Sequence, residues 1–94
     1  MNPARLPVLM PGDVLVLSRA GMNVSGNPHV YRRTARGALE VVCELQDLAR
    51  ALVIDPSEAP WLVGALVEGH LGLVRVQDVF HVERDGARVP GAGG

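Results

Sequence analysis

The sequence predicts an α+β domain in which N-terminal β-strands precede a three-helix unit and a C-terminal β-hairpin. Three observations support this: a β-branched run at Val14–Leu17, helical spacing of apolar residues between 35 and 52, and two apolar runs separated by Gln77-Asp78. The 94 residues suffice for one domain core but not for a core that also encloses a large active site. We therefore expect a single domain over residues 13–89.

The first third of the chain predicts a small β unit. Residues 1–12 contain three prolines, which fix φ and remove backbone donors, so we expect an extended segment that forms at most an edge strand. Pro11-Gly12-Asp13 predicts a turn. Val14–Leu17 lacks alternation, which indicates a strand covered on both faces, and His29–Arg33 alternates as a second strand.

The middle of the chain predicts helices. Apolar residues recur at helical spacing from residue 38 to residue 52, with Thr34 as the N-cap and Asp55-Pro56 as the end. The pattern does not distinguish one helix from two short ones. Ser57 is expected to cap the third helix, which continues to a stop at Gly69.

The last quarter predicts a hairpin. Its strands are Leu73–Val76 and Val79–Val82, separated by the two residues that the pattern assigns to the turn. Asp85-Gly86 is a second turn signal, which would return Arg88-Val89 as a short strand. Residues 90–94 are expected to form a flexible tail.

Composition restricts the classes of function. A hydrophobic share of 48%, a charged share of 20% and a net charge of −1 are typical of a globular domain and provide no general field for nucleic acid. The single cysteine, Cys43, excludes an internal disulfide. No apolar run reaches membrane-spanning length, so we expect a cytoplasmic protein.

The order of these elements resembles a winged helix-turn-helix. The residues that carry the resemblance are LQDLARAL at 45–52, DPSEAPWLVGALVEG at 55–69 and GLVRVQDVFHVERDG at 72–86. With the N-terminal strands added, the chain is similar to the RiPP recognition element, typified by the peptide chaperone of pyrroloquinoline quinone biosynthesis. That resemblance implies that a leader peptide is added as a strand beside residues 29–33 and against the helix at 57–68.

A third resemblance concerns residues 61–74. Trp61-Leu62-Val63-Gly64 and Gly69-His70-Leu71-Gly72-Leu73-Val74 have the spacing of the last strands of an SH3 domain. The resemblance implies a ligand-contacting role for Trp61, with Arg75 and Asp78 in place of the usual proline and tyrosine.

The function that these features favour is a non-catalytic peptide- or protein-binding module, which the resemblance extends to presenting a precursor peptide to modifying enzymes. An open strand edge would accept a peptide by β-augmentation, and its two arginines would attract acidic residues. Whether Trp61 is an exposed anchor or a core residue stays open at this point. The predicted peptide-binding residues are His29, Val30, Tyr31, Arg32, Arg33, Trp61, Gly64 and Glu68.

Two alternatives were compared with this function. A winged-helix transcription regulator of bacterial or phage type would contact DNA phosphates through Arg75, Arg84 and Arg88, although the expected third helix carries no basic residue. A small subunit of a larger assembly is the other alternative, and a homodimer is compatible with either. The spacing of Cys43 and the three histidines matches no zinc or catalytic motif, so no metal, cofactor or catalytic residue is predicted.

Overall fold

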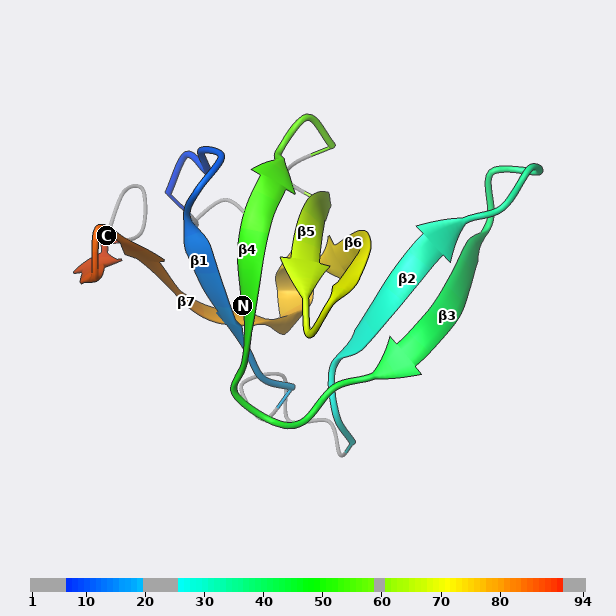
Figure 1. Cartoon of the computed structure of the whole chain (residues 1–94), viewed down its shortest axis with the longest axis horizontal. Coiled ribbons are helices and arrows are strands. Elements are labelled where there is room, and N and C mark those ends of the chain that lie inside the picture. Colours follow the sequence, from blue (N-terminus) through cyan, green and yellow to red (C-terminus); the bar gives the residue numbers. More distant parts are fainter. Residues whose placement is uncertain (1–6, 20–25, 59–60, 91–94) are drawn as a thin grey trace.

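The structure, a computed structural model, describes residues 7–19, 26–58 and 61–90, and these residues form an all-β fold. The predicted α+β class with three helices is wrong: the strands form one antiparallel sheet in the order β3-β2-β6-β5-β4-β1-β7-β8 (Figure 1). The strands are β1 (Val14–Leu17), β2 (His29–Arg33), β3 (Leu39–Glu44), β4 (Ala49–Asp55), β5 (Leu62–Val67), β6 (His70–Arg75), β7 (Val79–Arg84) and β8 (Ala87–Val89). In the described part of the chain, the helical content is a 3-10 turn at Val76–Asp78.

The sheet curls around a single hydrophobic core. One face of each central strand contributes small or branched apolar residues, which form one continuous cluster, because a single sheet can bury a face only by folding over it. The fully buried members include Leu15 and Leu17 on β1, Val53 on β4 and Val63 on β5. The β2–β3 hairpin forms one end of the sheet, where β2 pairs with β6 at Tyr31 (Figure 1).

The predicted helix between residues 35 and 52 is replaced by β3, a tight turn and β4. The β-branched Val41 and Val42 favour a strand, and Leu45, which is 1% exposed, anchors the connection in the core. Leu48 then adopts a left-handed conformation with φ of 66°, which allows a turn where the sequence shows no glycine or proline. Thr34 closes the β2–β3 hairpin and caps no helix, since its amide donates to the Ala38 carbonyl at 2.8 Å.

The predicted third helix over residues 57–69 is also wrong. Residues 62–67 form β5, in which Val63, Ala65 and Val67 alternate into the core and are 0% exposed. Gly69 serves a hairpin turn instead of a helix end. It follows Glu68, and the positive φ values of both residues (82° and 50°) are those of the two-residue turn that suits β-hairpins.

The predicted hairpin across Gln77-Asp78 is wrong, because β6 and β7 are separated in the sheet by β5, β4 and β1. The 3-10 turn carries the chain across the end of the sheet, and its Val76 amide donates to the Trp61 carbonyl at 3.0 Å. The turn at Asp85-Gly86 is confirmed, and it returns the chain as β8.

The first third agrees with its prediction. β1 and β2 have the predicted bounds, and β1 is covered on both faces, since Leu15, Val16 and Leu17 are all buried. The Asp13 amide donates to the Met10 carbonyl at 3.1 Å, as expected of the predicted turn. Most of the predicted N-terminal extended segment (1–6) and most of the tail (91–94) lie outside the described residues. Among the described residues there is no helix with the length and apolar character needed to cross a membrane.

Trp61 directly precedes β5, and the β5–β6 hairpin is followed by the 3-10 turn. The resemblance of this segment to an SH3 domain stays a prediction.

Candidate binding surface

The outer face of the sheet carries leucines where a one-layer sheet usually carries polar residues. We call this surface the leucine face and define it by side chains of β4, β5 and β6 that alternate with the buried ones. Its members are Leu52, Leu62, Leu66, Leu71 and Leu73. Leu71 is 71% exposed, and Leu52 and Leu66 are about 40% exposed. Clustered apolar exposure of this kind marks an interaction surface.

The strand register aligns part of the leucine face into one row. Val14 pairs with Leu52, Leu52 with Leu66, and Leu66 with Leu71, so four apolar side chains lie side by side across β1, β4, β5 and β6. At one end of β4 the row is flanked by Arg50, which is ion-paired with Glu83. The sequence signal for this surface was the lack of polar residues in either alternation phase of β5, LVGALV.

The second feature is the open edge of the sheet at β3. This strand ends the sheet order, and Leu39, Val41 and Val42 are 42%, 55% and 42% exposed. The Thr34 amide donates to the Ala38 carbonyl, and the Ala38 amide donates to Thr34 Oγ1. By alternation from this contact, Leu39 and Val41 direct their backbone N–H and C=O groups away from β2. A long apolar edge is a template for pairing with another strand.

The structure separates the predicted peptide-binding residues. β2 is not an open edge, because it pairs with β3 along its length and with β6 at Tyr31. Val30 is 0% exposed in the core, whereas Trp61 is 70% exposed, so it is a surface residue. Tyr31 and Gly64 share the outer face, since Leu73 pairs with both. The remaining four are dispersed: His29 is half-buried, Arg32 and Arg33 are exposed on β2, and Glu68 is exposed in the β5–β6 turn.

The three arginines predicted for DNA contact do not form a basic patch. Arg75 lies on β6, where its guanidinium sits over the Tyr31 ring at 5.8 Å. Arg88 lies over the Phe80 ring at 5.9 Å on the opposite edge of the sheet, and Arg84 is paired with Asp13. Recognition of DNA phosphates needs several cations on one surface, which this arrangement does not provide.

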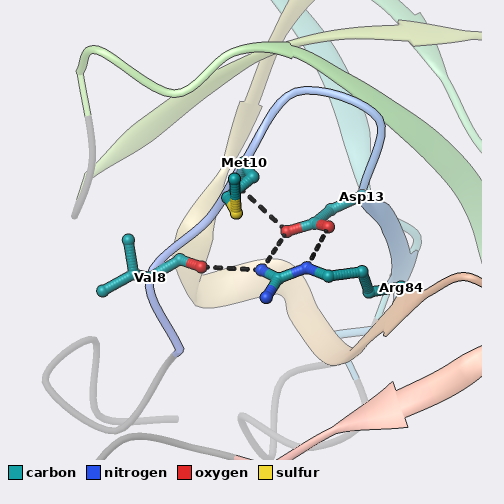
Figure 2. A network of polar contacts seen from close by, with 4 residues as sticks. All are labelled: Val8, Met10, Asp13 and Arg84. Carbon is teal, nitrogen blue, oxygen red and sulfur yellow. Dashed lines mark hydrogen bonds and ion pairs between the residues drawn. The ribbon is translucent and has the colours of Figure 1, made fainter.

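The Asp13–Arg84 pair joins the N-terminal segment to β7 (Figure 2). Arg84 donates from Nε and Nη2 to the two carboxylate oxygens at 2.7 and 2.8 Å, and from Nη2 to the Val8 carbonyl at 2.9 Å. The Met10 amide donates to Asp13 Oδ2 at 2.9 Å. The hydrogen bonds from Arg84, its charge and the Met10 amide hold the pKa of Asp13 below its ordinary value despite burial. Beside the pair is a pocket of about 230 Å³, lined by residues 10–13, 84 and 85. Since the two charges neutralise one another, we interpret the network as structural.

Asp78 is a buried carboxylate, and one of its two oxygens lacks a hydrogen-bond partner among the described residues. It is 1% exposed, its Oδ1 has no hydrogen-bond partner, and Arg19 Nε lies 3.8 Å away. Burial raises the pKa of Asp78 more than the charges of Arg75, Arg19 and His29 lower it. The ionised form of Asp78 therefore lowers the free energy of unfolding. The protonated form stabilises the fold fully below pH 3.8, the ordinary pKa, and this stabilisation is lost as the pH rises through the elevated pKa of the folded state.

We expect Asp78→Asn to be at least as stable as the wild type at pH 7, because the amide keeps the shape without the buried charge. Thermal unfolding from pH 4 to pH 8 checks this, and the variant should lose less stability across that interval than the wild type. A variant that melts well below the wild type at pH 7 would show that the ionised carboxylate is stabilising.

Cys43 is partly buried and packs against the core. Within the described ranges, no group of three His, Cys, Asp or Glu side chains is arranged to hold a metal ion. Comparisons with protein-family models, curated proteins and solved structures gave no match.

Proposed function

We propose that this chain is a non-catalytic protein-binding module that accepts an extended segment of its partner as an additional strand beside β3. The observation that carries the proposal is the open, six-residue β3 edge with three exposed apolar side chains. Strand addition uses main-chain hydrogen bonds for affinity and alternate side chains for specificity.

The exposed backbone of β3 supplies the pairing groups. Leu39 and Val41 direct their N–H and C=O groups away from β2. Their side chains lie on the outer face beside their β2 partners, Arg33 and Tyr31. An added strand would therefore rest its alternate side chains against Leu39 and Val41. Leu73, the next neighbour of Tyr31, extends this apolar surface.

The charges beside β3 favour an apolar partner over an acidic one. Arg32 pairs with Glu40 at 2.9 Å, and Arg33 pairs with Glu58. Both arginines therefore already have carboxylate partners, and exposed pairs of this kind add little further attraction. We propose that apolar residues at alternate positions, and not acidic residues, select the partner segment.

Nuclear magnetic resonance of the labelled chain tests this site. Peptides with alternating apolar residues would be selected from a displayed library against the chain and then titrated. We expect shifts concentrated at residues 38–45 and slower hydrogen exchange of the Leu39 and Val41 amides, because these donors point to the open edge. Binding that leaves both amides unprotected would contradict strand addition.

Two proline variants on β3 separate loss of the peptide-binding edge from loss of the fold. Val41→Pro removes an outward donor, so we expect a folded chain with peptide affinity at least tenfold weaker. Glu40→Pro is the matched control, because its donor faces β2 and its loss should disorder the hairpin. Equal peptide affinity of the Val41→Pro variant and the wild type would refute the role of β3.

A further inference from the structure

We propose that the leucine face is the interface of a symmetric homodimer. In this dimer, the two sheets pack face to face about a two-fold axis that runs along the row Val14, Leu52, Leu66 and Leu71. Each strand then lies over the same strand of the second copy. Residues on one side of the row in one copy meet residues on the other side of the row in the second copy. The inference does not rest on peptide binding at β3, because the row lies on β1, β4, β5 and β6, whereas the peptide would pair with β3.

The apolar content of the row suits packing against a second sheet. Sheets that pack face to face lie about 10 Å apart and interdigitate apolar side chains from each inner face. Leu66 is 41% exposed at the middle of the row, and Leu71, the most exposed leucine of the face, is at its end. The footprint spans four strands, roughly 20 by 25 Å with side chains included, which is smaller than standard stable interfaces and in the range of weak ones. We therefore expect a dimer that dissociates on dilution.

Charge complementarity favours a second copy as the occupant. On β4, Arg50 and Asp55 flank Leu52 on opposite sides of the row. Asp55 is exposed, and the Arg50 side chain is 60% exposed and contacts Glu83 of its own chain through Nη2, so its other guanidinium donors remain for a second carboxylate. Rotation about the row brings Arg50 of each copy over Asp55 of the other, which forms the same ion pair twice in one interface.

Asp55 is held in place on this face. A Cβ built on Gly64 would lie 3.2 Å from the Asp55 Cβ, so these two positions face the same side of the sheet. The Ser57 amide donates to Asp55 Oδ1 at 2.9 Å, and the hydrogen bonds from Ser57 lower the pKa of Asp55. The carboxylate is therefore ionised at neutral pH.

Gly64 interrupts the row of leucine side chains on β5. It is the one position on the outer face of β5 without a side chain, and it lies between Leu62 and Leu66. The rotation places it opposite the far end of β5, where the chain turns at Glu68. Because Gly64 has no side chain, β5 presents none to the facing turn at this position, where the neighbouring residue is Asp55.

A charge exchange tests the arrangement by sedimentation equilibrium of the full chain over a range of concentrations. We expect R50D and D55R each to weaken the dimer about tenfold or more, because each reversal acts twice and turns attraction into repulsion. The double variant R50D/D55R should return to within about threefold of the wild type, because the pair is restored with its signs exchanged. If the single variants weakened the dimer only by disturbing contacts within one chain, the double variant would not recover. It loses both the contact of Arg50 with Glu83 and that of Asp55 with Ser57.

A second pair of variants tests the face without ion pairs. Leu66→Glu should give a folded monomer, whereas Leu48→Glu, which changes a 53% exposed leucine outside the face, should dimerise like the wild type. A wild-type chain that remains monomeric at millimolar concentration would overturn the proposal. A dimer that survives Leu66→Glu but is lost with Val41→Pro would overturn it as well, by placing the contact at the β3 edge. Failure of the double variant to recover would exclude this two-fold arrangement.

Discussion

Replacing Gly72 with alanine is expected to lower the free energy of unfolding by about 3 kcal/mol, because no space exists for a side chain there. A Cβ at this position would lie 2.6 Å from Val30 Cγ1 and 2.8 Å from the Tyr31 carbonyl oxygen. Both contacts belong to β2, so relief requires β2 to move away from β6. The β2–β6 pairing is the connection that holds the β2–β3 hairpin to the rest of the sheet.

Thermal and urea unfolding would measure this loss, with an expected drop in melting temperature of roughly 10–20 °C for a domain of this size. Gly64→Ala is the matched control, since its Cβ would meet Asp55 at the milder distance of 3.2 Å and on the exposed face. We expect a clearly smaller loss for Gly64→Ala. Equal stabilities of the two variants would contradict the close approach of β2 to β6.

Asp13→Ala is the second variant with a large expected effect, a loss of about 2 kcal/mol at pH 7. The substitution leaves the Met10 amide without its acceptor and removes the carboxylate that receives both Arg84 nitrogens. Arg84 is partly exposed, so its unpaired charge can hydrate, which limits the loss. Asp13→Asn should be intermediate, because the amide oxygen retains one acceptor.

The same pair predicts part of the acid sensitivity of the fold. The pKa of Asp13 is lower in the folded chain than its ordinary value of 3.8. Its stabilising contribution is therefore complete above pH 3.8 and is lost as the pH falls through the lower folded-state pKa. Unfolding free energies measured from pH 7 to pH 2 should decrease less steeply below pH 4 in Asp13→Ala. Parallel curves for variant and wild type would show that Asp13 is not linked to acid unfolding.

Local sequence determined the first strands and several turns. Val14–Leu17 and His29–Arg33 are strands with the predicted bounds, since a β-branched run in the first and alternation in the second are local signals of a strand. Asp85-Gly86 forms its turn because glycine tolerates positive φ. The open edge was predicted one strand too early: β2 looked like an edge, and only the pairing of Tyr31 with Leu73 shows that β6 covers it.

Tertiary structure alone decided the middle of the chain. Apolar residues between 38 and 52 fit a helix or two strands equally well, because Val41 and Val42 satisfy either period and Leu48 gives no sign of its left-handed turn. The leucine face was equally hidden, since the cross-strand register that aligns Leu52, Leu66 and Leu71 joins residues distant in the sequence. Sequence patterns report contacts made within an element, whereas sheet pairing depends on non-local hydrogen bonds, so the fold and both candidate surfaces followed from the assembled sheet.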